Sequence, residues 1–168
     1  MRRVLVIGCS GAGKSTLARK LSAITGLPLV GLDRIYWRSG WIELPHSEWR
    51  AAVEKLVAEP AWVMDGNYSG TFDLRMPRAD TVIWLDYPRT VCLRRVLWRV
   101  IKGYGRTRAD LPPGCPEKFE AQFLRFVWNF PANSRPRIVD GLQRFGGHLR
   151  VLHFTRDREA AAFLREAA

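Results

Sequence analysis

The sequence predicts an α/β fold in three layers, α/β/α, in which helices cover both faces of a five-stranded, mostly parallel sheet. Short apolar runs alternate along the chain with longer segments of helical spacing, a pattern typical of strands buried on both faces. The length of 168 residues suits one domain with its own core. We therefore expect residues 1–168 to form a single domain.

The predicted strands and helices alternate along most of the chain. Strands are expected at residues 4–7, 27–30, 61–64, 81–85 and 150–154, where short apolar runs occur. Helices are expected at residues 14–24, 46–59, 89–102, 117–130 and 158–166, where apolar residues recur at helical spacing. His46 or Ser47 is expected to cap the second helix, and Pro60 ends it. The Gly- and Pro-rich segment at about 103–118 is predicted to form a short, Arg-rich lid.

Residues 8–15, Gly-Cys-Ser-Gly-Ala-Gly-Lys-Ser, match the phosphate-binding pattern G-x-x-x-x-G-K-[ST] without a mismatch. Glycines let main-chain N–H groups point at phosphate oxygens, and the helix that follows directs its positive end at the same anion. We expect Lys14 to contact the β- and γ-phosphates of a nucleoside triphosphate, Ser15 to bind Mg²⁺ and Thr16 to lie near the α-phosphate. The expected nucleotide-binding residues of this loop are Gly8, Ser10, Gly11, Ala12, Gly13, Lys14, Ser15 and Thr16.

Three aspartates follow predicted strands, and parallel sheets bind their ligands beyond the carboxyl ends of the strands. Asp65 ends an apolar strand, so we expect it to hold Mg²⁺, directly or through water, opposite Ser15. Asp33 could activate the hydroxyl group of an acceptor or join the outer shell of the metal. Asp86 precedes a Tyr-Pro turn, and we expect it to cap the next helix.

Between residues 89 and 108 the chain has seven basic side chains and no acidic one. Arg95 and Arg99 are four residues apart and share a helix face. Together with Arg106 in the lid, they are expected to stabilise the negative charge that spreads over a phosphoryl group during its transfer. The alternative is a solvated basic surface, or one that contacts nucleic acid.

The composition predicts anionic partners. The 27 basic and 16 acidic residues give a net charge of +11 and a pI ≈ 10.4, so nucleic acid, nucleotide phosphates and acidic lipid are the candidates. Arginine supplies 22 of the basic residues, which fits phosphate binding and equally fits a GC-rich genome. The chain has no apolar run of membrane-spanning length, and its three cysteines show neither metal-ligand nor disulfide spacing. We therefore expect a cytoplasmic protein without a membrane partner.

The phosphate loop and residues 63–66 (Val-Met-Asp-Gly) together resemble the nucleoside monophosphate kinase superfamily of P-loop proteins, of which adenylate kinase is the familiar member. Four further segments are residues 32–37 (Leu-Asp-Arg-Ile-Tyr-Trp), 64–68 (Met-Asp-Gly-Asn-Tyr), 85–88 (Leu-Asp-Tyr-Pro) and 106–115. They are most similar to the small adenylate-kinase-like family of DNA topology modulation proteins. The resemblance covers nearly the whole chain.

The resemblance implies roles for further residues. Asp65 corresponds to the carboxylate of the adenylate kinase segment Asp-Gly-Phe-Pro-Arg, and Asn67 and Tyr68 stand in place of its Phe and Pro. Arg75 lies where related kinases hold the phosphate or carboxylate of the acceptor. Arg95 and Arg99 match the arginines that lead into the lid.

These observations predict an ATP-binding, Mg²⁺-dependent phosphotransferase of the nucleotide-kinase type, whose acceptor is a small nucleotide or another hydroxyl or phosphate compound. The acceptor-binding region is expected at about 34–60, and the residues expected around the acceptor are Asp33, Trp37, Asn67 and Arg75. Outside the phosphate loop, the residues expected beside the donor nucleotide are Arg95 and Arg156.

The alternative is a regulatory P-loop ATPase of the topology-modulation type, associated with nucleic acid and without small-molecule kinase activity. A GTPase is a weaker alternative, because the sequence has no Asn-Lys-x-Asp segment to recognise guanine. The acceptor and the oligomeric state stay open at this point.

Overall fold

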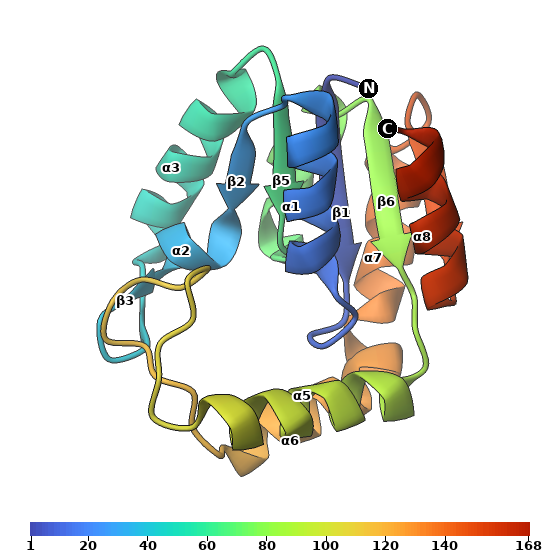
Figure 1. The fold of residues 1–168 in the computed structure, drawn as a ribbon. Helices are drawn as coiled ribbons and strands as arrows, with labels where there is room; N and C mark the ends of the chain where they lie inside the picture. The colour runs from blue at the N-terminus through green and yellow to red at the C-terminus, as the bar shows by residue number, and fades with distance from the viewer.

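The computed structural model describes residues 1–168 and contains a sheet of five strands, all parallel (Figure 1). In chain order the strands are β1 (Arg3–Gly8), β2 (Leu29–Gly31), β5 (Trp62–Asp65), β6 (Thr81–Leu85) and β7 (Arg150–Phe154). Their order across the sheet is β2-β5-β1-β6-β7, so β1 lies in the centre and connects to the phosphate loop. The register pairs Val6 with Asp65 and Gly8 with Leu85, which brings the carboxyl ends of β5, β1 and β6 together.

Helices lie on both faces of this sheet, as the three-layer prediction requires (Figure 1). The longer ones are α1 (Lys14–Thr25), α3 (His46–Ala58), α5 (Arg89–Gly103), α6 (Ala121–Asn133), α7 (Arg135–Phe145) and α8 (Asp157–Glu166). α1 and α8 cover the near face in Figure 1, and α7 lies behind the sheet. Between β5 and β6 the chain forms two short 3₁₀ turns, η1 (Ser69–Thr71) and η2 (Met76–Arg78), on either side of α4 (Phe72–Arg75), which contacts α3 and α7.

The core is apolar on both faces of the central strands. Val4, Leu5, Val6 and Ile7 of β1 are completely buried, and every residue of β5 and β6 is buried as well. The edge strands β2 and β7 contain exposed or half-buried residues. A parallel strand that is covered on both faces needs a continuous apolar run, and this requirement makes the strands visible in the sequence.

Because of two prolines, the sequence does not predict the full extent of the helices in residues 121–145. The sequence predicts that the fourth helix ends at 130 and predicts none between 131 and 149, whereas α6 continues through Pro131 to Asn133 and α7 follows directly. Pro136 lies in the first turn of α7, where its missing N–H has no partner to lose. The expected start of α6 at residue 117 is also wrong, because Glu117 pairs with Tyr104 in an isolated bridge instead.

The predicted acceptor-binding region contains elements that its sequence does not reveal. After β2 come the short helix α2 (Leu32–Tyr36) and an antiparallel hairpin of β3 (Trp37–Arg38) and β4 (Ile42–Glu43). Trp41, in the turn of the hairpin, has a φ of 62°, a conformation that is uncommon for residues other than glycine. Neither His46 nor Ser47 caps α3, because Pro45 occupies the N-cap position.

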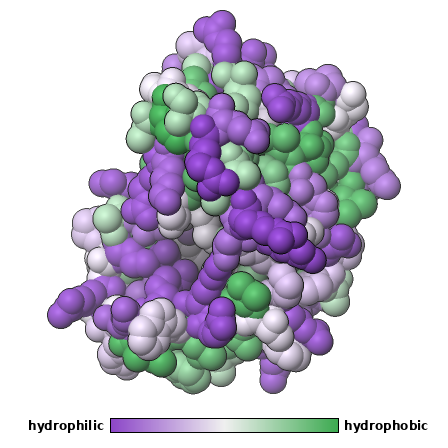
Figure 2. All heavy atoms as spheres, turned by 45° about the vertical axis from the view of Figure 1, so that its right-hand side comes forward, coloured by the Kyte–Doolittle hydropathy of each residue, from purple (hydrophilic) through white to green (hydrophobic).

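α5 and α6 pack side by side across the carboxyl end of the sheet, next to the phosphate loop (Figure 1). The Sγ atom of Cys9 in this loop lies 3.9 Å from the carbonyl oxygen of Val127 in α6. Hydrophilic side chains cover most of the face that Figure 2 presents, and apolar ones form smaller groups between them. No helix is both long enough and apolar enough to cross a membrane.

Candidate functional site

The phosphate loop connects β1 to α1 in a conformation that requires glycine. Gly8 and Gly11 have φ values of 142° and 85°. A Cβ atom on Gly8 would lie 2.3 Å from the carbonyl oxygen of Leu85, and one on Gly11 would lie 2.4 Å from that of Cys92. The loop is therefore pressed against β6 on one side and α5 on the other. The first turn of α1 has no side-chain cap, so its N–H groups are available to an anion.

Lys14 and Cys9 differ in what they can contribute to this loop. The half-buried Lys14 donates a hydrogen bond of 3.1 Å from Nζ to the carbonyl oxygen of Cys9, within the same loop. The ammonium group is thus held beside the main-chain amides that would face a phosphate. The Cys9 thiol is buried, and hydrogen bonding to Cys92 together with burial raises its pKa, so it stays protonated and fills space.

Asp65 lies at the end of β5, beside the phosphate loop, and is nearly buried. Burial raises the pKa of its carboxyl group, while the charge of Lys14 and hydrogen bonding with Ser15 act in the opposite direction. The Oδ1 atom is buried and has no hydrogen-bond partner. An unpartnered carboxylate oxygen next to a serine hydroxyl is a donor set that fits Mg²⁺, so these residues are compatible with the expected metal.

Asp33 lies on α2, directly after the edge strand β2, and is half-buried. The phenol hydroxyl of Tyr68 donates a hydrogen bond of 2.6 Å to its Oδ1 atom. The charge of Asp33 also contributes to the raised pKa of Asp65, so the two carboxylates are near neighbours. The structure therefore brings together the phosphate loop, Asp65 and Asp33.

Four aromatic rings form a wall beside Asp33, which we call the aromatic wall and define as Tyr36, Trp37, Trp49 and Tyr68. The ring centroids of Tyr36 and Tyr68 are 4.7 Å apart, and those of Trp49 and Tyr68 are 5.0 Å apart. Trp37 packs edge-on against Tyr36 at 5.1 Å. Trp37 is thus part of this wall, and its contact with an acceptor stays a prediction. Tyr68 is a residue to which the sequence analysis assigned no role, although its place in the Asp-Gly-Asn-Tyr segment could have indicated one.

Arg75 does not face the acceptor site, which corrects the role implied by the resemblance. Its side chain is completely buried. The guanidinium group donates hydrogen bonds to Thr71 Oγ1 at 3.0 Å and to the main-chain carbonyl oxygens of Gly66, Asn67 and Tyr68 at 3.0, 2.5 and 2.8 Å. Burial lowers the pKa of Arg75 to about 9. The guanidinium group therefore fixes the turn after β5 and is not available to a ligand.

The side chain of Asn67 takes no part in the hydrogen bonds of Arg75. Arg75 contacts only the main-chain carbonyl of Asn67, whose side-chain Oδ1 atom is buried without a hydrogen-bond partner. A buried acceptor atom of this kind favours a ligand that brings a hydrogen-bond donor.

The basic side chains of α5 and the predicted lid differ in their surroundings. Arg99 and Arg108 both approach Oε1 of the buried Glu117, with Nε–Oε1 distances of 3.0 and 2.7 Å. Burial and the like charge of Arg108 lower the pKa of Arg99. Arg106 is exposed. The sequence analysis did not assign Arg108 a role, although it lies in the same basic segment two residues from Arg106.

Arg95, on α5, does not share Glu117 with Arg99 and Arg108. Its side chain contacts the start of α8 instead. It forms an ion pair with Asp157 and lies over the ring of Tyr87, 5.5 Å from the centroid. Arg156, the N-cap residue of α8, precedes Asp157 directly, and its main-chain N–H donates to Glu159 Oε2 at 3.1 Å. The two residues expected beside the donor nucleotide are therefore neighbours.

The predicted lid, residues 103–118, touches the hairpin of the predicted acceptor region. The N–H of Gly40 donates to the carbonyl oxygen of Gly114 at 2.8 Å, and Nε1 of Trp41 donates to that of Pro116 at 3.1 Å. Cys115 Sγ lies 3.2 Å from the carbonyl oxygen of Arg38. The segment thus packs against β3 and the turn of the hairpin.

Asp86 does not cap α5, contrary to the prediction, because Pro88 is the N-cap residue. The Asp86 carboxylate instead binds Arg135 Nε at 2.9 Å and His153 Nε2 at 3.0 Å. It therefore ties the end of β6 to α7 and β7.

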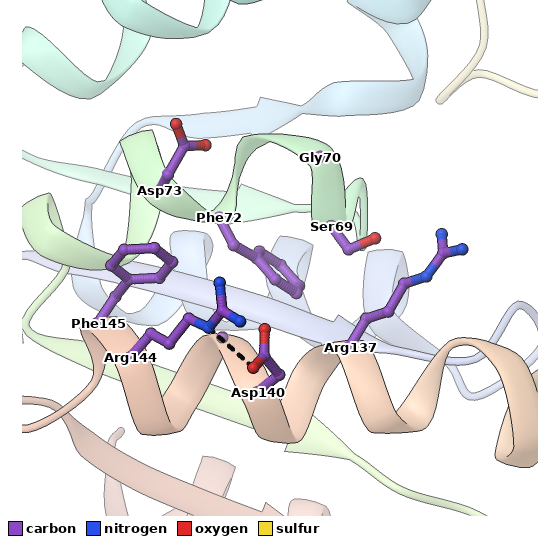
Figure 3. Close-up of a pocket in the computed structure, with 9 residues that line it drawn as sticks. Ser69, Gly70, Phe72, Asp73, Arg137, Asp140, Arg144 and Phe145 are labelled. Atoms are coloured by element: carbon purple, nitrogen blue, oxygen red, sulfur yellow. Dashed lines mark ion pairs between the residues drawn. The ribbon is translucent and has the colours of Figure 1, made fainter.

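Two hollows lie near η1. One, of about 320 Å³, lies between η1, α4 and α7 and contains the ion pair of Arg144 with Asp140 (Figure 3). The other, of about 260 Å³, we call the aromatic hollow. Its lining residues are Tyr36, Glu43, Leu44, His46, Trp49, Tyr68 and Gly70. Three of them belong to the aromatic wall, so the hollow adjoins the side chain that binds Asp33.

Comparison with known proteins identifies the fold. No protein-family model matches the sequence, and no curated protein matches it. Among solved structures, a shikimate kinase from Acinetobacter baumannii in complex with shikimate is similar with a TM-score of 0.59 and 16% identity, over 99% of this chain and 90% of that one. A gluconokinase from Sinorhizobium meliloti 1021 gives a TM-score of 0.56 and 19% identity, over 99% and 89% of the two chains. A putative kinase from Chloroflexus aurantiacus gives 0.53 and 18%, over 99% and 97%. The chain has the α/β fold of these P-loop kinases, as the sequence predicts.

Proposed function

We propose that this protein is a kinase that uses ATP and Mg²⁺ to phosphorylate a hydroxyl group of a small molecule. The observation that carries the proposal is the arrangement at one edge of the sheet. A phosphate loop with its lysine, a buried carboxylate with an unpartnered oxygen and a second, oriented carboxylate lie side by side there. Solved structures of the same fold are named as kinases of shikimate, gluconate and a sugar, which supports the reaction class by analogy of fold.

The phosphate loop is the proposed binding site of ATP. Main-chain amides of residues 8–16 and the ammonium group of Lys14 hold the phosphates, and Arg95 and Arg156 flank the remainder of the nucleotide. Ser15 and Asp65 are the proposed ligands of Mg²⁺. When bound, the ion supplies positive charge that neutralises the β- and γ-phosphate oxygens.

The acceptor is proposed to lie between Asp33, Trp37 and Asn67. Its hydroxyl oxygen forms a bond to the γ-phosphorus, the bond from that phosphorus to the bridging oxygen breaks, and ADP leaves. Asp33 takes the hydroxyl proton, and the bond from Tyr68 keeps its carboxylate in place. Arg99 and Arg106, now joined by Arg108, are the proposed donors to the phosphoryl oxygens.

Calorimetric titration with Mg·ATP tests the nucleotide site. Lys14→Ala should lower the affinity at least tenfold. Lys20→Ala, which removes an exposed lysine from the same helix, should leave it unchanged. Unchanged binding by the Lys14 variant would defeat the assignment. The reaction itself is tested by ADP release with a set of hydroxyl compounds.

A second candidate function is a regulatory ATPase of the topology-modulation type that binds nucleic acid. It is favoured by the net charge of +11 and by exposed aromatic side chains, Trp98, Tyr104 and Phe119, in or next to the basic segment. This alternative predicts ATP hydrolysis that polynucleotide stimulates, with an affinity that falls steeply as salt rises. Either function suits the cytoplasm, where ATP is available and where the three unpaired cysteines stay reduced.

A further inference from the structure

We propose that the acceptor carries no phosphate or carboxylate group and is an uncharged or amino-bearing polyhydroxyl compound with an apolar face. A sugar, an amino sugar and a nucleoside share this chemistry. The inference rests on the proposed kinase function and deepens it by naming the class of acceptor. Four features carry it: an occupied arginine, unpartnered oxygen atoms that accept hydrogen bonds, the aromatic wall and, next to that wall, a hollow without basic side chains.

The arginine in the position expected for binding an acidic acceptor is already occupied. The Arg75 guanidinium makes four hydrogen bonds to Thr71 and the 66–68 turn and has no exposed surface. To bind a phosphate or carboxylate it would have to release three main-chain carbonyl oxygens inside the protein. Buried acceptors without a partner are strongly unfavourable, so the turn retains the arginine and an anionic acceptor gains nothing from it.

Two oxygen atoms at the proposed acceptor position are left to accept hydrogen bonds from a ligand. Tyr68 occupies Oδ1 of Asp33, which leaves Oδ2 to a ligand. The Oδ1 atom of Asn67 is buried and unpartnered. Hydroxyl and amino groups satisfy such atoms, whereas a carboxylate or phosphate oxygen placed against them would be repelled.

The charges that line the aromatic hollow also favour a ligand without an acidic group. Its lining includes the Glu43 carboxylate and His46 but neither arginine nor lysine. Burial, with Glu43 as the second cause, raises the pKa of Tyr36 to about 12, so the phenol stays neutral. The rings of Tyr36, Trp49 and Tyr68 offer faces on which a sugar or base can stack.

The arginines near this hollow are paired with acids of their own. Arg50 binds Asp73 at 2.7 Å, and Arg38 binds Glu48 at 2.6 Å. Arg34 is exposed on α2 and does not line the hollow. The lid arginines that share Glu117 belong to the proposed phosphoryl site. The charges around the acceptor thus favour a neutral or positively charged molecule.

Paired acceptors test the inference, because only one member of each pair carries an acidic group: glucose against gluconate, glucosamine against gluconate, and adenosine against AMP. ADP release with Mg·ATP should give a kcat/KM at least tenfold higher for the uncharged or amino member of whichever pair is used. Turnover within the sugar pairs or within the nucleoside pair shows whether a sugar or a nucleoside supplies the hydroxyl group. A preference for gluconate or AMP, or turnover of shikimate alone, would overturn the inference while leaving the kinase function intact.

Two glutamate variants provide a control that keeps the phosphate loop unchanged. Glu43→Gln removes the charge in the hollow and should reduce the preference within the productive pair several-fold. Glu59→Gln removes an exposed charge at the other end of α3, outside the hollow and without an ion pair to an arginine, and should not change it. If no member of any pair reacts while Lys14-dependent ATP binding is intact, the proposed class of acceptor is wrong. Loss of that ATP binding would instead refute the proposed function.

Discussion

The hydroxyl group of Tyr68 donates a 2.6 Å hydrogen bond to Asp33, which joins the turn after β5 to the helix after β2. Tyr68 has a φ of 32°, in the left-handed region that residues other than glycine rarely adopt. Its carbonyl oxygen accepts hydrogen bonds from Arg75 at 2.8 Å and from Thr71 Oγ1 at 3.0 Å. These bonds hold the unfavourable conformation, and the conformation places the phenol against the carboxylate.

Tyr68→Phe should change the activation free energy of the reaction, measured as kcat, more than it changes the free energy of unfolding. The variant keeps the ring of the aromatic wall but removes the hydrogen bond that orients Asp33, and a bond to a charged group contributes about 1.5–3 kcal/mol. We expect kcat to fall roughly tenfold to a hundredfold, by conversion of that energy, while the KM for ATP stays constant. Steady-state kinetics and urea unfolding measure the two effects. Tyr36→Phe is the matched control, because Tyr36 belongs to the same wall but has no bond to Asp33. Equal losses of kcat in both variants would argue against the orienting role.

Arg75→Met should unfold the protein more easily instead of weakening acceptor binding specifically. The variant leaves the carbonyl oxygens of Gly66 and Asn67 without their donor, and it removes one of the donors to the carbonyl oxygen of Tyr68 and the donor to Thr71 Oγ1. Removing one partner of a buried charged network costs about 3–5 kcal/mol. Arg78→Met is the control, since Arg78 is exposed and makes one long contact of 3.4 Å, to the carbonyl oxygen of Val57. A stable Arg75 variant with a greatly raised KM for the acceptor would restore the role that the resemblance implied.

The parts of the fold that were predictable are those in which local sequence and burial agree. β6 has the predicted bounds because a strand inside a parallel sheet is apolar along its whole length, and the edge strand β7 also has the predicted bounds although its residues are exposed or half-buried. The phosphate loop was predictable because its function depends on consecutive residues. α7 was not, because Pro131 and Pro136 resemble helix breaks, whereas each is tolerated at its position.

The parts of the site that were not predictable depend on contacts distant in sequence. The neighbouring sequence does not distinguish Arg75 from an arginine that binds a ligand. The carbonyl oxygens that accept its hydrogen bonds reach it only when the 66–68 turn folds back over it. The pairing of Glu117 with two arginines requires α5 and the predicted lid to meet. The Tyr68–Asp33 bond spans 35 residues and depends on the positions of β2 and β5 in the sheet.

Glu117→Gln should loosen the predicted lid. Glu117 is 5% exposed and is the carboxylate that both Arg99 and Arg108 approach. Without its charge the two guanidinium groups repel each other in a half-buried site, which costs on the order of 3 kcal/mol. We expect trypsin to cleave the variant faster after Arg106 and Arg108. Glu120→Gln, whose exposed carboxylate lies 3.6 Å from Lys118, should cost less than about 1 kcal/mol and leave the cleavage rate unchanged. Equal cleavage rates in all three proteins would show that Glu117 does not hold the lid.

The pH dependence of stability should distinguish Asp65 from an ordinary paired aspartate. Burial raises the pKa of Asp65, so the folded protein binds a proton at this carboxyl group more tightly than the unfolded chain does. As the pH rises above about 3.9, the ordinary aspartate value, this group therefore subtracts stability. Without Mg²⁺, Asp65→Asn should melt at a higher temperature than the wild type at pH 8, and the difference should shrink toward pH 4. Adding Mg·ATP should raise the melting temperature of the wild type more than that of the variant.

Asp73 provides a control, because its carboxylate is expected to add stability at high pH where that of Asp65 subtracts it. Its bond to Arg50 lowers the pKa of Asp73, so this carboxylate adds stability above its ordinary pKa and loses that contribution on acidification. Asp73→Asn should therefore melt below the wild type at pH 8, with a difference that also shrinks toward pH 4. Circular dichroism melts of the three proteins across this range measure both signs. If Asp65→Asn were destabilised at pH 8 in the same way as Asp73→Asn, the Asp65 carboxylate would already be satisfied by the protein, and the case for a metal at its free oxygen would fail.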